Sequence, residues 1–360
     1  MSEAGEAGGA GDVVKQEWAG RVRLSADLYE AGLSEWAQRS AHSRGRERPE
    51  EPCSLRTPYQ RDRDRIVHSK SFRRLKHKTQ VFIAPEGDHY RTRLTHTLEV
   101  SGIARTVARA LRLNEDLAEA VSLGHDLGHT PFGHAGEGVI DEVLRRMGAG
   151  GFQHNEQSAR VVEVLENDGR GLNLTWEVRD GIRHHSGDES RATLESQIVH
   201  LADRIAYVNH DIDDALRAGL ITPADLPEGP VALLGGSGSE RIDALVHDVV
   251  DTSEGRGAVA QTPAVGAALE DLRTFLFETV YPLALEQAGG EKIRQLITQL
   301  MEHFLEHPED LPAAPLPSGA ASADRLELLR AVTDYVAGMT DRYAQRVYLE
   351  LFMPKCWGNL

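Results

Sequence analysis

The segment at residues 194–216 restricts the fold more than any other part of this chain. Its apolar residues recur with the 3.6-residue period of an α-helix, at Leu194, Ile198, Leu201, Ala202, Ile205, Val208, Ile212 and Leu216. A long helix with one continuous apolar face is stable only when that face packs against neighbouring elements. We therefore predict a central helix here, with the rest of the domain built around it.

The surrounding segments show helical rather than strand periodicity, so the predicted fold class is all-α. Asn114 ends one apolar pattern, Asn155 is placed as an N-cap, and the Pro/Ala/Gly/Ser-rich residues 308–322 interrupt the C-terminal part. One short segment, 80–84, is a strand candidate. The other predicted helices cover residues 94–111, 117–123, 134–147, 158–165, 239–251, 261–285, 288–306 and 323–352.

Charge and cysteine content argue against several classes of protein. The net charge of −16 disfavours broad electrostatic binding of nucleic acid. No run approaches the roughly 18 apolar residues of a membrane span, and residues 1–12 lack the basic start and apolar stretch of a secretion signal. With only Cys53 and Cys356, no disulfide framework is expected. We predict a cytoplasmic protein without a membrane partner, with residues 1–12 disordered.

Basic residues are concentrated in one short stretch of this acidic chain. Between Arg56 and Lys78 there are nine Lys or Arg residues, opposed only by Asp62 and Asp64. Two interpretations stay open at this point: a pocket or face that binds an anion, or a solvated helix surface.

Histidines are concentrated in the middle of the chain, where they indicate metal or acid–base chemistry. Twelve of the 16 lie between His68 and His210. The dipeptide His125-Asp126 alone is usually a surface pair. However, His96 lies on the preceding predicted helix, and Asp203 lies mid-way along the apolar central helix, where an unpaired carboxylate is costly to bury. Together these four residues predict a metal site.

The predicted ligands are two imidazoles and two carboxylates, which suit a divalent ion. Mn²⁺, Fe²⁺, Co²⁺, Ni²⁺ and Zn²⁺ accept such a mixed set, and the carboxylates extend it to Mg²⁺. On a six-coordinate ion, two positions stay open for a phosphate oxygen and a water, as metal-assisted hydrolysis requires. A closed structural zinc site is disfavoured, because no cysteine is near and acid–base groups crowd the same loop.

Several longer stretches resemble one enzyme family. The spaced H…HD…D pattern is shared by the HD superfamily, including phosphodiesterases and nucleotidases. More narrowly, the chain resembles the deoxynucleoside triphosphate triphosphohydrolases, that is, the dGTPase and dGTPase-like proteins. The stretches that carry this resemblance are QRDRDRI (60–66), SFRRL (71–75), KTQV (78–81), HDLGHTPFGHAGE (125–137), FQHNEQS (152–158) and DRIAY (203–207).

The resemblance implies a fold, a division of the chain and oligomerisation. The fold would be an HD-domain helical bundle with additional C-terminal helices. Residues 1–55 would be a disordered or loop-rich extension, 56–220 the metal-dependent hydrolase core, and 221–360 a helical region packed on it. The implied assembly is a homo-oligomer, a hexamer or tetramer, in some relatives with an allosteric nucleotide.

The resemblance also implies an activity and roles for named residues. The implied reaction cleaves a dNTP to a deoxynucleoside and tripolyphosphate. It would use one divalent ion, with Mn²⁺ as the leading candidate, held by His96, His125, Asp126 and Asp203. His134 and Glu137 would form the catalytic dyad, and their spacing of three residues lets them share a helix face. His129 and His154 would contact the phosphate or the leaving group, and Arg93 would balance negative charge of the triphosphate. Gln80 would lie against the sugar, and Tyr207 and Asp211, on the face of the central helix that follows Asp203, would pack and hold the sugar.

Two other functions remain open from the sequence. One is an HD phosphodiesterase or 5′-nucleotidase. This function explains the metal site but requires fewer positive charges from the basic stretch. The other is a nucleotide-binding sensor with little turnover, which the full set of ligands and dyad residues disfavours. His184, His185, His200 and His210 are interpreted as structural or packing residues.

Overall fold

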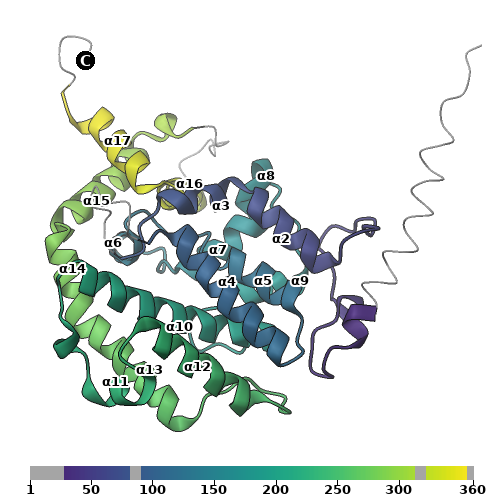
Figure 1. The fold of residues 1–360 in the computed structure, drawn as a ribbon. Helices are drawn as coiled ribbons and strands as arrows, with labels where there is room; N and C mark the ends of the chain where they lie inside the picture. The colour runs from purple at the N-terminus through teal and green to yellow at the C-terminus, as the bar shows by residue number, and fades with distance from the viewer. Residues whose placement is uncertain (1–27, 82–90, 313–321, 355–360) are drawn as a thin grey trace, which may run out of the picture.

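The computed structural model describes residues 28–81, 91–312 and 322–354, and their regular elements are all helical (Figure 1). Within these residues the only strand-like pairings are two isolated bridges, Arg46 with Thr175 and Thr79 with Thr92. The all-α prediction is confirmed. The α-helices are α2 (Pro58–His68), α3 (Lys70–Arg74), α4 (Arg93–Ala110), α5 (Glu115–Gly124), α6 (Gly133–Arg146), α7 (His154–Arg160), α8 (Glu166–Gly169), α9 (Trp176–Arg183), α10 (Leu194–Arg217), α11 (Glu228–Leu234), α12 (Gly238–Ser253), α13 (Pro263–Phe275), α14 (Tyr281–Gln287), α15 (Gly290–Glu306), α16 (Ser322–Ala337) and α17 (Asp341–Phe352).

The predicted central helix is α10, and it packs against α4, α5 and α12. Thr193 caps it by accepting a hydrogen bond from the Ser196 amide, which satisfies one of the free N–H groups of its first turn. Its apolar face is buried, as the fully enclosed Ile198 and Ile205 show. Asn114 caps the neighbouring α5 in the same way, through the Leu117 amide. Helices α4, α5 and α10 carry or directly precede His96, His125 and Asp203.

A second hydrophobic cluster lies beside the first. It joins α6 to α15, α16 and α17, with Phe132, Ile140, Met301 and Val336 among its buried members. Helices α12 and α13 instead share the core of α4, α5 and α10. Residue 220 therefore does not separate the two cores, and the proposed division of the chain at that position remains a prediction.

Two local predictions are wrong. Asn155 lies inside the first turn of α7, whose N-cap is Gln153, because Glu137 from another helix accepts the His154 amide. The predicted helix 323–352 is two helices, since Thr340 caps a new helix by accepting from the Tyr343 amide.

In the strand candidate 80–84, Gln80 and Val81 are not in a strand. Residues 1–12, the rest of that candidate, most of 308–322 and Cys356 lie outside the described residues.

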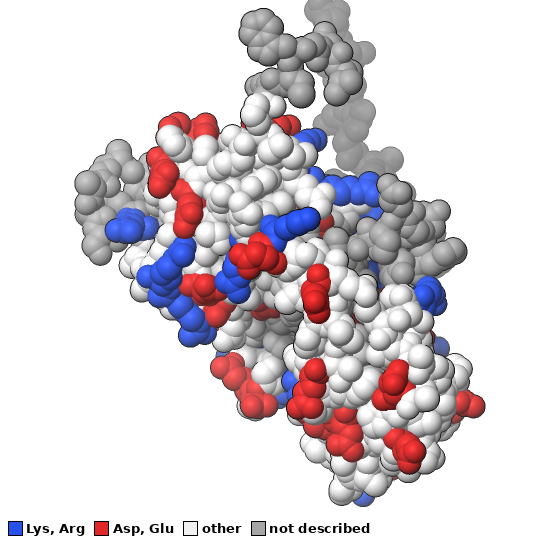
Figure 2. All heavy atoms as spheres, turned by 90° about the vertical axis from the view of Figure 1, so that its left-hand side faces the viewer, with Lys and Arg blue, Asp and Glu red and all other residues white. Residues whose placement is uncertain are grey.

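The basic stretch from Arg56 to Lys78 forms many ion pairs with carboxylates. Arg61 and Arg65 both bind Glu50, and Arg63 binds Glu119, a residue of α5. On the face drawn in Figure 2, most of the basic side chains lie in the upper half, with acidic side chains among them, and acidic side chains predominate in the lower half. No described helix is long and apolar enough to span a membrane.

Candidate metal centre and catalytic cluster

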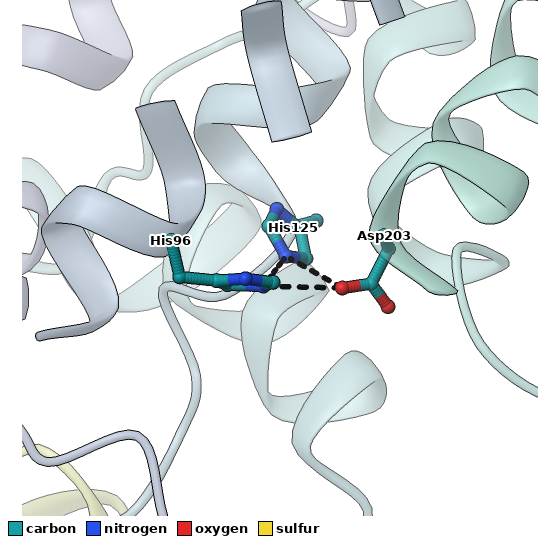
Figure 3. A group of neighbouring side chains, drawn as sticks. All are labelled: His96, His125 and Asp203. Carbon is teal, nitrogen blue, oxygen red and sulfur yellow. Dashed lines mark hydrogen bonds and ion pairs between the residues drawn. The ribbon is translucent and has the colours of Figure 1, made fainter. Parts of the chain in front are cut away.

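Three segments far apart in the sequence bring His96, His125 and Asp203 together (Figure 3). His96 comes from α4, His125 follows the last residue of α5, and Asp203 comes from α10. One ligand atom from each lies within 4.8 Å of the others. The His96 Nε2 atom is 3.1 Å from Asp203 Oδ1 and 3.3 Å from His125 Nε2. Three of the four residues proposed as metal ligands therefore lie together.

Hydrogen bonds on the outer nitrogens orient both imidazoles. His125 Nδ1 lies 2.6 Å from the Ser122 carbonyl oxygen, which can only accept, so Nδ1 carries the proton and Nε2 offers its lone pair inward. His96 Nδ1 lies 2.9 Å from His210 Nε2, whose own Nδ1 is 3.0 Å from Asp211 Oδ1. When His210 is neutral and its Nδ1 donates to Asp211, its Nε2 accepts from His96 Nδ1, and the inner nitrogen of His96 is then unprotonated. Two inward lone pairs beside a carboxylate are a donor set for a divalent cation.

Asp126, the fourth predicted ligand, lies beside this group. Its Oδ1 atom is 3.4 Å from His125 Nε2, and its Oδ2 atom is 3.8 Å from His96 Nε2 and 3.0 Å from Arg93 Nη1. Burial alone would raise the pKa of Asp126, but His125, His129 and Arg93 hold it well below its ordinary value. Asp126 is therefore an ionised, buried carboxylate. Asp126 also groups with His129 and His154 as a second cluster able to hold a metal ion.

The predicted dyad residues contact each other at the start of α6. His134 Nδ1 lies 3.1 Å from Glu137 Oε2, and the His134 side chain is 55% exposed. The other oxygen of Glu137 is 2.9 Å from both the backbone nitrogen and Nδ1 of His154. Burial acts to raise the pKa of Glu137, but these hydrogen bonds from His134 and His154 outweigh it and lower the pKa far below its ordinary value. One carboxylate thus orients two imidazoles.

The loop between α5 and α6 owes its shape to glycines and a strained residue. Phe132 adopts left-handed backbone angles, with φ of 62°, and Asp341 from α17 accepts its amide hydrogen bond. A Cβ atom at Gly136 would lie 2.0 Å from the Pro131 carbonyl oxygen, so only glycine fits there. This packing places His129 and His134 on the same side, with ring centroids 5.4 Å apart.

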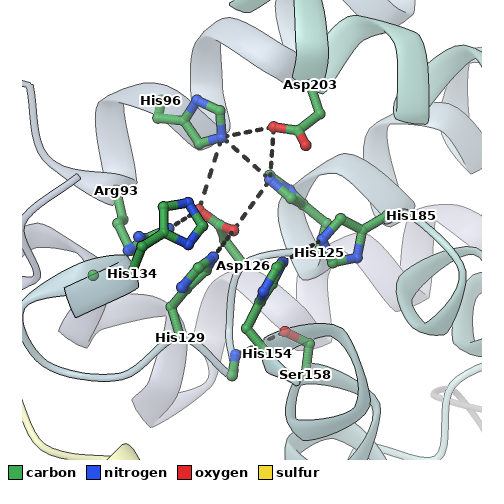
Figure 4. Close-up of polar contacts among 12 residues, drawn as sticks. Arg93, His96, His125, Asp126, His129, His134, His154, Ser158, His185 and Asp203 are labelled. Atoms are coloured by element: carbon green, nitrogen blue, oxygen red, sulfur yellow. Dashed lines mark hydrogen bonds and ion pairs between the residues drawn. The ribbon is translucent and has the colours of Figure 1, made fainter. Parts of the chain in front are cut away.

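His129, His154 and Arg93 surround Asp126 (Figure 4). His129 Nε2 lies 3.2 Å from Asp126 Oδ1, and its ring stacks on that of His154 with centroids 4.0 Å apart. Burial, with the nearby charge of Arg93, lowers the pKa of His129 well below its ordinary value. The His129 ring is therefore neutral and able to act as a ligand or a hydrogen-bond partner.

The residues expected at the sugar lie around the same centre but in different environments. Gln80 is buried, and its Oε1 atom has no hydrogen-bond partner among the described residues. Tyr207 Oη accepts from Arg273 Nε at 3.0 Å. Both oxygens of Asp211 are engaged: Oδ1 with His210, and Oδ2 with Tyr281 Oη at 2.7 Å. Asp211 is thus held on two sides within the protein.

Sequence reasoning missed two histidines of the cluster. His210 was interpreted as packing, yet it contacts His96 directly. His185 was interpreted as structural, yet it is fully buried, with Nε2 3.2 Å from His154 Nε2 (Figure 4). Burial, with His125 and His154 near, lowers the pKa of His185 to about 3. The concentration of histidines in this part of the chain was the available signal, but it did not show which of them meet in space.

Comparisons with known proteins agree with this geometry. The HD domain family matches residues 93–208, and the phosphohydrolase-associated domain family matches residues 259–350. A deoxyguanosinetriphosphate triphosphohydrolase-like protein of Caldanaerobacter subterraneus subsp. tengcongensis is 55% identical over 334 residues, which are 93% of this chain and 96% of the relative. The protein of the same name from Clostridium perfringens strain 13 is 48% identical over 93% of this chain and 98% of the relative.

The chain belongs to the family of deoxyguanosinetriphosphate triphosphohydrolase-like proteins. As a member of this HD family it is a phosphohydrolase. The HD match covers all four predicted metal ligands and the dyad, from α4 to α10. The phosphohydrolase-associated domain contains Asp341, which binds the loop between α5 and α6.

Proposed function

We propose that this protein is a metal-dependent dNTP triphosphohydrolase, which cleaves a dNTP to a deoxynucleoside and tripolyphosphate. The observation that carries the proposal is the His96–His125–Asp203 cluster with the His134–Glu137 pair beside it. The family's name for its members, deoxyguanosinetriphosphate triphosphohydrolase-like, supports the substrate class.

The residues present fit a divalent metal ion. Metal–ligand distances of about 2.1 Å place neighbouring ligand atoms roughly 3.0–3.4 Å apart. Three of the distances around His96 and His125, of 3.1, 3.3 and 3.4 Å, fall in this range. The distances from His125 Nε2 to Asp203 Oδ1 and from His96 Nε2 to Asp126 Oδ2 are longer, at 3.8 Å each. We propose that His96, His125, Asp126 and Asp203 hold the ion and that Mn²⁺ is the leading candidate for it. When bound, the ion supplies Lewis-acid stabilisation of charge on a phosphoryl oxygen.

The dyad residues would move the proton. Glu137 is ionised, so His134 donates its Nδ1 proton to it, and Nε2 is the atom that can take a proton from water or give one to the leaving oxygen. The exposure of His134 leaves this nitrogen accessible. Its ring would be oriented before substrate arrives, since Glu137 is itself held by two hydrogen bonds from His154.

Other groups would bind the triphosphate and the sugar. Arg93, fully buried beside Asp126, adds a fixed positive charge. His129 lies beside Asp126 and stacks on His154, and this position supports a contact near the phosphate or leaving group. The unpaired Gln80 oxygen supports a hydrogen bond from the sugar hydroxyl. Tyr207 and Asp211 would pack the sugar from α10.

The test is product identification. Purified protein is incubated with Mn²⁺ and each of the four dNTPs, and the nucleoside and phosphate products are separated by chromatography. The proposal predicts deoxynucleoside and tripolyphosphate from at least one dNTP. Release of only monophosphate and pyrophosphate, or no turnover of any dNTP, would contradict it.

A further inference from the structure

His210 contacts a proposed metal ligand without being one itself. It lies on α10, about two helical turns beyond Asp203. The side chains of His210 and His96 are almost completely buried. The Nε2 atom of His210 is 2.9 Å from His96 Nδ1, and the two rings meet edge to face with their centroids 5.0 Å apart. The outer nitrogen of His96 therefore faces an imidazole rather than bulk water.

Metal binding would fix the direction of this hydrogen bond. A neutral imidazole carries one proton, which lies on either of its ring nitrogens. A cation held by His96 Nε2 takes the lone pair of that atom, so the proton lies on Nδ1, which can then only donate. The His210 Nε2 atom is at hydrogen-bond distance from Nδ1 and can accept this proton. His96 as a metal ligand thus needs an acceptor at the position that His210 occupies.

The hydrogen bonds continue from His210 to Asp211. To accept at Nε2, a neutral His210 must carry its own proton on Nδ1, which lies 3.0 Å from Asp211 Oδ1. The other carboxylate oxygen, Oδ2, accepts a hydrogen bond from Tyr281 Oη at 2.7 Å. His96 then donates to His210, and His210 donates to Asp211. Each donor in this series has an acceptor, and Asp211 is held from both sides.

This series of hydrogen bonds joins three helices that are far apart in the sequence. His96 comes from α4, His210 and Asp211 come from α10, and Tyr281 is the first residue of α14. Tyr281 also belongs to the phosphohydrolase-associated domain, whereas His96 belongs to the HD domain. A helix of the associated domain is thereby connected to a proposed metal ligand through two side chains of α10.

We propose that His210 is a positioning residue of the metal site, which orients the ligand His96 and is itself held by Asp211 and Tyr281. A hydrogen bond on the outer nitrogen of a histidine ligand fixes the orientation of its ring and raises the basicity of its inner nitrogen. Loss of such a partner weakens metal binding by about 10–100-fold. This inference rests on the metal site of the proposed function, but not on the nucleotide cleaved.

The affinity for Mn²⁺ tests the proposal without any measurement of activity. The protein is stripped with a chelator, and the Mn²⁺ dissociation constant is measured by isothermal titration calorimetry. His210→Leu removes the acceptor, and we expect the dissociation constant to rise about 10–100-fold. His210→Gln should recover most of this loss, because its amide group can accept from His96 and donate to Asp211. A wild-type dissociation constant in folded His210→Leu, equal losses in the two variants, or no Mn²⁺ binding by the wild type would overturn the proposal.

A neighbouring residue provides the control for a general loss of stability. Asn209 is a buried polar residue next to His210 on α10, but its side chain bonds the Ile205 carbonyl oxygen and Arg241 instead. Asn209→Ala should therefore lower the melting temperature of the stripped protein and leave the Mn²⁺ dissociation constant unchanged. If Asn209→Ala weakens Mn²⁺ binding as much as His210→Leu does, affinity follows stability alone and the positioning role is wrong.

The far end of the series supplies a milder variant. Tyr281→Phe removes only the hydroxyl group that donates to Asp211. It should raise the Mn²⁺ dissociation constant by a smaller factor than His210→Leu does, although Tyr281 is not a proposed metal ligand. Should His210→Leu not fold, as judged by circular dichroism, Tyr281→Phe decides the question, and an unchanged dissociation constant in that variant would overturn the proposal.

The outcome can be distinguished from that for the proposed activity. Weaker Mn²⁺ binding in His210→Leu, together with no tripolyphosphate from the wild type, would contradict the proposed function and support the role of His210. Tripolyphosphate release by the wild type, together with equal Mn²⁺ dissociation constants in the wild type and His210→Leu, would do the reverse.

Discussion

At the scale of single residues, Glu137 organises the acid–base part of the site. It accepts hydrogen bonds from His134 and from both nitrogens of His154 that face it. Since it is buried and ionised, it fixes the tautomers of two imidazoles at once. The sequence spacing predicted the contact with His134, because residues three apart share a helix face. The contact with His154 depends on the position of α7 relative to α6, and the spacing of residues in the sequence does not reveal that position.

Substitution of the exposed dyad residue tests its role directly. His134→Gln removes the proton-transfer group, and we expect kcat to fall about 10²–10⁴-fold. Because His134 is 55% exposed, the melting temperature should stay close to that of the wild type. Both are measured on one preparation, by product release and by thermal unfolding. A loss of less than about tenfold would exclude His134 as the proton-transfer group.

A pair of glycines on one helix tests whether α6 is held tightly against the preceding loop. Gly136→Ala would bring a Cβ atom to 2.0 Å from the Pro131 carbonyl oxygen, while nothing lies within 4 Å of a Cβ at Gly138. We expect Gly136→Ala to lower the free energy of unfolding by about 1–3 kcal/mol. Gly138→Ala, the matched control, should raise it by roughly 0.5–1 kcal/mol. Urea denaturation measures both, and equal effects would disprove the close approach.

At the scale of elements, α17 contacts the loop that bears the dyad. Asp341, at its first residue, accepts hydrogen bonds from the Phe132 amide and the Thr79 amide, each at 2.9 Å, and from the Thr79 hydroxyl. Lys78 donates to the His129 carbonyl oxygen and to the Ala337 carbonyl oxygen at the end of α16. The C-terminal helices therefore support the backbone of the site from outside it.

This support should be measurable in both stability and rate. Asp341→Ala leaves two buried amides without acceptors, and we expect a loss of about 1–3 kcal/mol in the free energy of unfolding. The rate should fall as well, since Phe132 directly precedes the helix of His134. Glu350→Ala on the same helix, an exposed control, should change neither. A normal kcat in Asp341→Ala would show that the loop keeps its shape without this contact.

At the scale of the whole molecule, helical periodicity predicted α4, α5, α6 and α10 because their apolar faces repeat along the sequence. It also placed the four proposed ligands, since the spacing of His96, His125-Asp126 and Asp203 puts each on or next to a core helix. His185 and His210 could not be found this way. The role of His210 depends on the packing of α10 against α4, and that of His185 on the packing of α9 against α5 and α7; both are decided by tertiary packing. The end of α16 was missed, although Gly338 and the N-cap Thr340 are residues that commonly end one helix and start the next.

Metal binding should stabilise the whole fold. An ion that binds only the folded state adds about 2.7 kcal/mol when its concentration is 100 times its dissociation constant. We therefore expect saturating Mn²⁺ to raise the melting temperature of the stripped wild-type protein, measured by calorimetry. Asp203→Asn, which lacks a proposed ligand, should show a much smaller rise. An equal rise in both proteins would mean that Mn²⁺ binds elsewhere.

The most direct test of the central claim is the phosphate product of dGTP with metal-loaded protein. Wild-type and Asp203→Asn proteins are incubated with dGTP and Mn²⁺, the metal is then removed by a chelator, and phosphorus NMR identifies the products. We predict tripolyphosphate from the wild type and about a hundredfold less or none from Asp203→Asn. If dGTP and the other dNTPs stay intact, or if only pyrophosphate is formed, the proposed triphosphohydrolase function is wrong.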